Sequence, residues 1–291
     1  MDIAIHLGAH CTDDEGLVRC LLRNRGVLAA QGIAVPGPAR YRTLLRDASA
    51  QLGGQTASAD TAQLLLDEIV EEEGARRVVL SFDSFMAFPR WAIGRNQLYP
   101  GATDRTVALA ALFPGHRVEF HLAIRDPATF LPALFERQKG KSYAEFTEGC
   151  DPAALAWSDL VARIREASPA VPLTVWCDED TPLIWPDVLR TVSGHAASLV
   201  LEEADTILEG IMSPEGFARM QAYLASHPPQ TGVQRRRIVS AFLDKFSLPE
   251  RIEMELDLPG WDEAYVAALS AAYDADCLRI ARMPGVRFIV P

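Results

Sequence analysis

The sequence predicts an α/β fold: a three-layer sandwich with a central, mostly parallel sheet and a helical extension toward the C-terminus. Short apolar runs of strand length recur through the first two-thirds of the chain. Segments with helical periodicity and the length of crossover connections lie between them. After about residue 200 the strand pattern fades. We therefore expect one domain over residues 1–291, with a sheet-forming core over 1–200 and a helical extension over 201–291 that covers one face of the sheet.

The first four predicted strands are residues 3–7, 77–81, 118–124 and 172–177, and a last short strand is predicted at 286–290. A helix is predicted from residue 17 to about 30, because leucines recur there at helical spacing. Further helices are predicted at 58–73, 103–113, 127–140, 151–168, 214–226, 232–246 and 260–281. Ligands of such sheets gather beyond the carboxyl ends of the strands. This rule places residues 10–15, Asp83, Arg125 and residues 178–180 along one edge.

The amino-acid composition argues against several classes of function. A formal net charge of −11 argues against nucleic-acid binding, which needs clustered lysine and arginine. The one dense basic cluster, residues 235–237, is more typical of a solvated helix face. No run of eighteen apolar residues and no N-terminal targeting signal occur, so we expect a soluble, cytoplasmic protein without membrane contact. Five cysteines form no CxxC pair, which favours reduced, packed thiols.

The most informative stretch is the turn that follows the first strand. It has the form of a phosphate-binding turn, in which a strand leads into the N-terminus of a helix. Three carboxylates, Asp13, Asp14 and Glu15, stand where a phosphate group would lie. Thr12 and Glu15 also have capping-box spacing, so their side chains are predicted to satisfy the N–H groups of the helix itself. In that case the chain occupies its own anion site.

Several segments resemble the PAPS-dependent sulfotransferase superfamily, in particular its bacterial branch, over most of the chain. At the N-terminus, Ile5-His6-Leu-Gly8-Ala9-His10 leads into a helix and then Leu28-Ala-Ala-Gln-Gly32-Ile33-Ala-Val-Pro36. Further on, Arg125-Asp126-Pro127, the run Trp176 to Asp180 with Trp185-Pro186, and the ending from Ala272 through Met283-Pro284-Gly285 are similar to family segments. The resemblance implies a P-loop NTPase-like sulfotransferase fold.

The resemblance also implies a site for the cofactor PAPS, formed by Gly8, His10, Cys11, Thr12 and Arg125. The family's phosphosulfate loop usually reads Gly-x-x-Lys-Thr-Gly-Thr-Thr. This chain has Cys11 in place of the lysine and Asp13-Asp14-Glu15 in place of Gly-Thr-Thr. In the motif that holds the 3′-phosphate, Ala133 replaces the usual serine. The cofactor motifs are therefore degenerate.

Electrostatics decides how serious these substitutions are. Two like unit charges about 4 Å apart repel by roughly 4 kcal/mol at an effective dielectric constant near 20. One ionised acid facing the phosphosulfate group would therefore cost much of the cofactor's binding energy, and the lysine that would compensate is missing. Arg125 alone, without the family's serine, is an incomplete phosphate site. Its alternative role is a structural ion pair with Asp126, Glu136 or Asp83.

Two residues are candidates for catalytic groups. Asp83 follows the second predicted strand, where related enzymes often carry the acid or histidine that takes the acceptor's proton. Its alternative role is to cap a short helix at residues 84–88. His10 lies near the same sheet edge and is the better histidine candidate, because His6 is expected to be packed and hydrogen-bonded inside the sheet.

These observations leave three function classes open. We favour a sulfotransferase-like protein that is non-catalytic or a divergent binding protein. The second class is an atypical sulfotransferase that transfers a sulfuryl group to a small-molecule or carbohydrate hydroxyl. The third is a divalent-cation site at the first strand–helix turn, although no metal-ligand spacing supports it. Its expected ligands are His10, Asp13, Asp14, Glu15 and Asp83. Cys11 is expected to be inert, since the neighbouring carboxylates oppose thiolate formation. An aromatic run (Phe82, Phe85, Phe88, Trp91, Tyr99) is either core or the wall of an acceptor cleft.

Overall fold

The computed structural model describes residues 1–138, 140–254 and 258–291 and contains a six-stranded sheet in which every pair of neighbouring strands is parallel. The order is β2-β3-β1-β6-β7-β8. Its strands are β1 (Asp2–His6), β2 (Ile33–Ala34), β3 (Arg77–Ser81), β6 (Arg117–Ile124), β7 (Leu173–Cys177) and β8 (Val286–Ile289). All five predicted strands are confirmed. The two-residue edge strand β2 is too short to give a periodic pattern and was not predicted.

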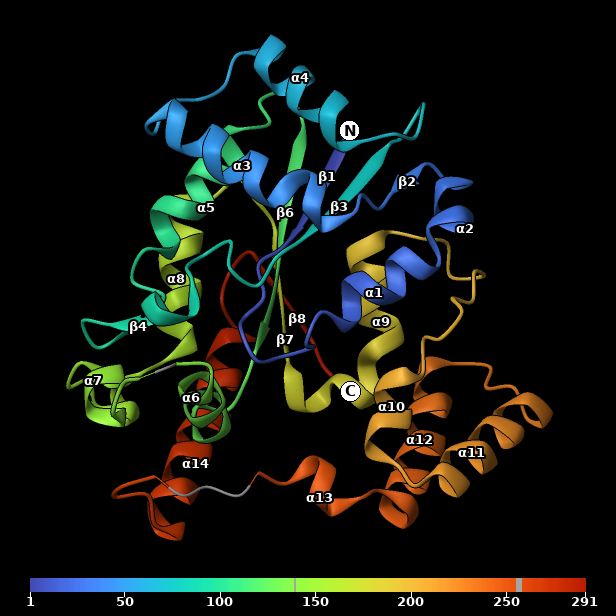
Figure 1. Cartoon of the computed structure of the whole chain (residues 1–291). Helices are drawn as coiled ribbons and strands as arrows, with labels where there is room; N and C mark the ends of the chain where they lie inside the picture. Colours follow the sequence, from blue (N-terminus) through green and yellow to red (C-terminus); the bar gives the residue numbers. More distant parts are fainter. Residues whose placement is uncertain (139, 255–257) are drawn as a thin grey trace.

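Helices cover both faces of the sheet, which confirms the predicted α/β architecture with three layers (Figure 1). One face packs against α3 (Pro38–Leu52), α4 (Ala59–Ile69), α5 (Ala102–Ala111), α6 (Pro127–Glu136), α8 (Trp157–Ala167) and α14 (Glu263–Ile280). The other face packs against α1 (Gly16–Arg23), α2 (Arg25–Ala29) and α9 (Thr181–Ser193). Alternate residues of each strand point to opposite faces, so each strand contributes to both hydrophobic clusters.

The predicted helices differ from the observed ones mainly at their ends. The helix predicted over 17–30 is two helices, α1 and α2, separated at Asn24. The buried amide of Asn24 donates to the carbonyl of Glu202 at 2.9 Å and accepts from its N–H at 2.8 Å, which fixes the break. The helix predicted over 127–140 ends at Glu136, and Lys139 lies outside the described residues. Residues 84–88, the short helix suggested after Asp83, are not helical.

The segment after residue 200 lies on both faces of the sheet, so the prediction that it covers one face is wrong. Four helices form a small helical unit beside α9. They are α10 (Thr206–Ile211), α11 (Pro214–Ser226), α12 (Gly232–Phe246) and α13 (Pro249–Ile252). Helix α14 instead packs against α6 and α8 on the opposite face, and β8 then extends the sheet beside β7. Two arginines of the basic cluster are half-buried and pair with carboxylates, Arg235 with Asp205 and Arg236 with Asp187, so they hold α12 in place.

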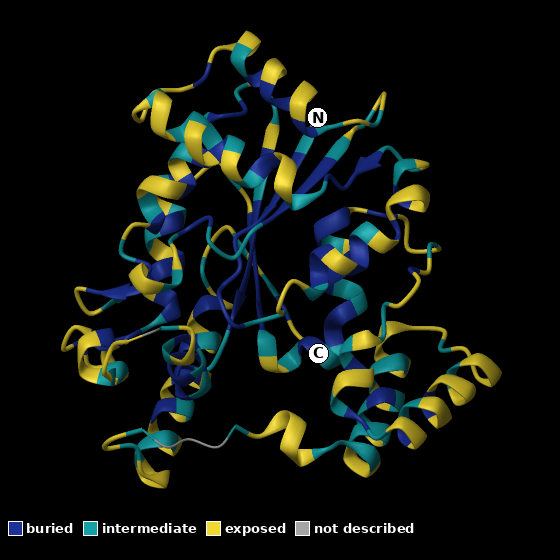
Figure 2. Ribbon diagram, in the orientation of Figure 1, coloured by how far each residue is buried: buried dark blue, intermediate teal, exposed yellow. Residues whose placement is uncertain are grey.

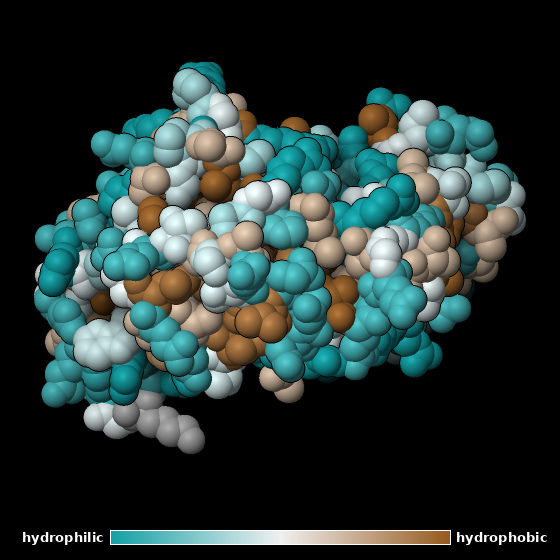
Figure 3. Space-filling model, turned by 90° about the horizontal axis from the view of Figure 1, so that it is seen from above, coloured by the Kyte–Doolittle hydropathy of each residue, from teal (hydrophilic) through white to brown (hydrophobic). Residues whose placement is uncertain are grey.

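Burial follows the layers. The strands are dark blue along the centre of Figure 2, and exposed residues lie on the outer sides of the helices. Seen from above in Figure 3, most of the surface is hydrophilic, and hydrophobic residues form several separate patches. Within the described ranges, none of the helices combines the length and the apolar composition that crossing a membrane requires. The short strands β4 (Ile93–Gly94) and β5 (Gln97–Leu98) form a separate hairpin, and α7 (Tyr143–Thr147) packs against it.

Candidate functional site

The loop after β1 lies at the point where the sheet's connections change direction. The connections from β1 through β2 and β3 run to one side of β1, and those through β6, β7 and β8 run to the other. Ligands of open α/β sheets bind at such switch points. Beyond the end of β1 the chain stays paired with β6, because the Ala9 N–H donates to the carbonyl of Ala123 at 3.0 Å. Gly8 has φ +99°, and a Cβ there would lie 3.0 Å from the Cα of Asp83, so this position requires glycine.

A cavity of about 290 Å³ opens beside this loop, at the carboxyl ends of β1 and β3. We call it the loop cavity. Its walls carry four carboxylates and two guanidinium groups. The lining residues are His6, Ala9, Cys11, Thr12, Asp13, Asp14, Glu15, Arg42, Ser81, Asp83 and Arg137. The sequence-predicted residues Cys11, Thr12 and Asp83 are thus brought together, whereas Gly8, His10 and Arg125 do not line the cavity.

The start of α1 is satisfied by the chain itself, but not by the predicted capping box. The carboxylate of Asp13 accepts a hydrogen bond from the Leu17 N–H at 2.7 Å. Glu15, at the cap position, is left-handed with φ 65° and makes no side-chain capping bond. The Thr12 hydroxyl donates to the carbonyl of Ala9 at 2.9 Å instead. The capping box of Thr12 and Glu15 is therefore wrong, while the expectation of a self-occupied helix end is confirmed through Asp13.

Two arginines that sequence reasoning missed form ion pairs with acids around the loop. Arg137, just after α6, lies 2.7 Å from Asp14 and 3.6 Å from Asp83. Arg42, on α3, lies 2.6 Å from Glu15 and donates to the Ser81 carbonyl at 3.2 Å. Both arginines are far from the loop in sequence, so no local pattern announces these pairings.

Cys11 occupies the position that the resemblance assigns to a lysine. Its side chain is buried, and burial raises the pKa of the thiol to about 11. The thiol is therefore protonated at neutral pH, and it has no charge with which to hold a phosphate group. This agrees with the prediction that Cys11 is inert.

Arg125 lies behind the loop. Its guanidinium donates to the carbonyl of Cys11 and, from Nε, to the Thr129 hydroxyl at 2.9 Å. Within the described ranges it forms no ion pair with Asp126, Glu136 or Asp83, so the ion-pair alternative is wrong. Arg125 supports the backbone of the loop, and its role in phosphate binding remains a prediction.

The predicted cluster at residues 178–180 also lies at this edge, directly after β7. Burial first, and then the adjacent Glu179 carboxylate, raise the pKa of Asp178 to about 7. Asp13 and Asp14 raise it further, and Arg125 lowers it. Because burial is the largest cause, Asp178 resists ionisation mainly as a group removed from water, and the neighbouring carboxylates add to this effect.

The two catalytic candidates have different surroundings. The Asp83 carboxylate is about one-third exposed (34%) in the wall of the loop cavity and accepts from the Ser84 hydroxyl at 3.0 Å. Since residues 84–88 are not helical, its alternative role as a helix cap is wrong. His10 is fully buried behind the loop. The Tyr99 hydroxyl lies 2.8 Å from Nδ1 of His10, and the Ser84 hydroxyl lies 3.2 Å from its Nε2. Burial lowers the pKa of His10 to about 4. A catalytic role for either residue stays a prediction.

His6, not His10, is the histidine of the loop cavity. As expected, it is buried and hydrogen-bonded: its Nδ1 lies 2.9 Å from the Ser81 hydroxyl, and its ring stacks on Trp176. Its Nε2 has no partner among the described residues. Sequence reasoning placed His6 correctly in the sheet but did not foresee that the same side chain reaches the cavity.

A smaller pocket of about 40 Å³ adjoins the loop cavity, and Arg42 lines both. Phe82, Phe85 and Phe88 line this aromatic pocket, whereas Tyr99 is core and Trp91 is exposed outside it. The predicted aromatic run is therefore divided between wall, core and surface. In the described part of the chain, no three histidine, cysteine or acidic side chains are grouped so that they would hold a metal ion.

Comparisons of this chain with protein-family models, with curated proteins and with solved structures found no match.

Proposed function

We propose that this chain is a sulfotransferase-like binding protein that does not use PAPS and that binds a small polyhydroxylated ligand, of the carbohydrate class, in the loop cavity. The observation that carries the proposal is the hydrogen bond from the Leu17 N–H to the Asp13 carboxylate. A phosphosulfate group would have to displace this carboxylate from the helix N-terminus or lie beside it.

The residues of the loop do not suit PAPS. Asp14 and Glu15 already use the guanidinium groups of Arg137 and Arg42, and the buried Cys11 thiol is neutral. Four carboxylates against two arginines leave the walls with a formal charge of −2. A cofactor with several negative charges would meet repulsion of roughly 4 kcal/mol from each ionised acid about 4 Å away, at an effective dielectric constant near 20.

The same groups suit a neutral ligand rich in hydroxyl groups. Ionised carboxylates accept hydrogen bonds from hydroxyls, and guanidinium groups donate to them in a fixed planar geometry. Asp83 and Arg137 offer both kinds of group on one wall of the cavity. The aromatic pocket beside Arg42 would receive an apolar ring face. A neutral sugar satisfies these polar groups without adding charge.

The test is calorimetry with adenosine 3′,5′-bisphosphate and with a panel of neutral monosaccharides. The proteins are the native chain, Asp83→Asn, and a repair variant with Cys11→Lys, Asp13→Gly, Asp14→Thr and Glu15→Thr. We expect no nucleotide binding by the native chain and a gain on repair. We also expect a monosaccharide to bind the native chain and to bind Asp83→Asn about tenfold more weakly, since one charged hydrogen bond is lost. Asp60→Asn, an exposed acid outside the cavity, is the matched control.

The outcomes separate the function classes. Micromolar nucleotide binding by the native chain, lost in Arg125→Ala, would overturn the proposal and favour the atypical sulfotransferase, whose acceptor would then be a small-molecule or carbohydrate hydroxyl. Saturable binding of Mg²⁺ or Ca²⁺ in the same cell would favour the cation site instead. If the native chain binds neither a monosaccharide nor the nucleotide, the proposed carbohydrate class of ligand is wrong.

A further inference from the structure

A second cavity, of about 400 Å³, lies at the opposite, amino edge of the sheet. We call it the amino-edge cavity. Its polar groups come from three neighbouring strands and from the end of α9. The lining residues are Arg117, Glu119, His121, Pro172, Leu173, Thr174, Thr191, Gly285, Val286 and Arg287. None of these residues takes part in the loop cavity.

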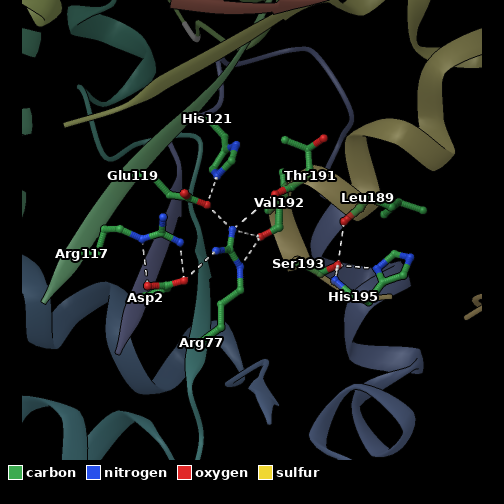
Figure 4. Close-up of polar contacts among 10 residues, drawn as sticks. All are labelled: Asp2, Arg77, Arg117, Glu119, His121, Leu189, Thr191, Val192, Ser193 and His195. Carbon is green, nitrogen blue, oxygen red and sulfur yellow. Dashed lines mark hydrogen bonds and ion pairs between the residues drawn. The ribbon is translucent and has the colours of Figure 1, made fainter. Parts of the chain in front are cut away.

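A carboxylate–imidazole pair forms the inner wall of the amino-edge cavity. Oε1 of Glu119 lies 3.1 Å from Nε2 of His121, and the Arg77 guanidinium donates to the same carboxylate (Figure 4). Arg77 is held in turn by the carbonyl of Val192 at 2.7 Å, at the C-terminal end of α9. The pair is therefore fixed between the sheet and a helix and does not depend on a flexible loop.

The protonation of this pair follows from its contacts. Burial opposes ionisation of Glu119, but the hydrogen bond from His121 and the charge of Arg77 prevail and lower the pKa of Glu119 to about 2. Burial also lowers the pKa of His121, which keeps the ring neutral. An ionised carboxylate only accepts hydrogen bonds, so the proton of the neutral ring lies on Nε2. Nδ1 is then a lone-pair acceptor.

That acceptor has no partner. His121 is 1% exposed, and its Nδ1 is buried without a hydrogen bond among the described residues. Leaving a buried polar atom without a hydrogen-bond partner costs free energy. A donor that enters the cavity and reaches Nδ1 would recover this cost, and hydroxyl groups are the smallest common donors.

The guanidinium group of Arg287 lies in the same row of paired residues across the sheet as His121. His121 pairs in register with Thr174, and Thr174 pairs with Arg287. Strands lie about 4.8 Å apart, so the Cα atoms of His121 and Arg287 are separated by about 10 Å. Arg287 is exposed and makes no ion pair in the described part of the chain, whereas Arg117 is bound to Asp2 through contacts of 2.9 and 2.5 Å. An anionic group of a ligand could therefore pair with the Arg287 guanidinium.

From this arrangement we infer that the amino-edge cavity binds a small hydroxycarboxylate. Its hydroxyl donates to Nδ1 of His121 and its carboxylate binds Arg287. The hydroxyl of Thr174, between the two, is available to either group. A ligand with only a hydroxyl would contact His121 and not Arg287, and a ligand with only a carboxylate would contact Arg287 and not His121.

The test uses L-lactate as the probe, with propionate, which lacks the hydroxyl, and L-lactamide, which lacks the charge. Ring nitrogens of the native chain labelled with ¹⁵N-histidine are followed by NMR, and the His121→Gln variant assigns the signal. We expect L-lactate to move the Nδ1 resonance of His121 saturably. We expect the two analogues to bind about tenfold more weakly, as for the loss of one hydrogen bond to a charged or buried partner.

Two arginine variants complete the test. Arg287→Gln should weaken L-lactate binding about tenfold, while Arg282→Gln, an exposed arginine that does not line the cavity, should bind like the native chain. Arg287 is exposed, so its variant should fold even if His121→Gln does not. Equal affinity for L-lactate and propionate, native-like binding by Arg287→Gln, or no saturable shift at millimolar concentrations would each overturn the inference.

Discussion

The Asp13 carboxylate lies 2.7 Å from the backbone nitrogen of Leu17, four residues along the chain. This contact places a negative charge at the positive end of α1, where a phosphate-binding turn would place a phosphate group. It has two consequences. The helix end is stabilised without a ligand, and an anion that approaches the same point meets a like charge.

Substitution of Asp13 should therefore destabilise the protein. Asp13→Ala removes the acceptor for the Leu17 N–H and should lower the free energy of unfolding by about 1 kcal/mol, as for loss of a helix cap. Asp13→Asn keeps an acceptor and should lower it less. Urea denaturation measures both. The control is Asp60→Ala, because Asp60 lies in the first turn of α4 without the capping role of Ser58. An equal loss in the control would contradict a specific role for Asp13.

The Tyr99 hydroxyl should be needed for the loop's inner packing. It accepts from the backbone N–H of His10 at 3.0 Å and lies 2.8 Å from Nδ1 of the same residue, in a fully buried setting. Tyr99→Phe leaves both groups without that partner and should cost about 2–3 kcal/mol of unfolding free energy. Tyr223→Phe, at a tyrosine that is 42% exposed, should cost little. Matching losses in the two variants would refute the proposed role.

Asp178 should make the stability of the protein depend on pH. Its pKa is raised to about 7, mainly by burial, from an unfolded value near 3.8. The folded state therefore binds more protons than the unfolded state between these values, so this group's contribution to stability falls as pH rises from about 4 to 7. Asp178→Asn should remove that fall.

The measurement is the difference in unfolding free energy between Asp178→Asn and the native chain at pH 5 and at pH 8. We expect the variant to gain about 1–2 kcal/mol relative to the native chain at the higher pH, after allowance for the partial exposure of the side chain. A difference that does not change with pH would show that Asp178 ionises normally.

Cys11 should react slowly with thiol reagents. Its pKa is raised from 9 to about 11, which lowers the thiolate fraction at neutral pH by about a hundredfold, and its side chain is only 6% exposed. Alkylation followed by peptide mass spectrometry should label Cys11 far more slowly in the folded protein than in denaturant. Fast labelling of the folded protein would mean that the loop opens and exposes the thiol.

The main strands could be predicted because apolar runs of the right length stand between helical segments, and a buried parallel strand needs such a run. Helix α3 was missed because only Tyr41 and Leu45 of its fifteen residues are buried, which leaves a weak apolar stripe. The break at Asn24 was missed because its cause, the backbone of Glu202, lies far along the chain. In each case a local pattern does not contain the contact that decides the structure.

Some features of the candidate site could also be predicted from the sequence, and others could not. The acids of the first turn and the common sheet edge follow from the sequence, because adjacent residues and strand ends determine them. The role of Asp13, and not Glu15, as the group that satisfies α1 depends on backbone angles that no spacing rule gives. The pairing of Arg42 with Glu15 and of Arg137 with Asp14 needs the folded chain.

The sequence by itself determined the α/β class, the run of parallel strands and the acidic character of the first turn, since these depend on periodicity and on neighbouring residues. Only the tertiary structure decided which charges form ion pairs and which histidine reaches the loop cavity. It also decided that His121 and Arg287 lie in one row across the sheet at its amino edge. The physical reason is that burial and charge pairing depend on distances between side chains that are remote in sequence, and folding alone sets those distances.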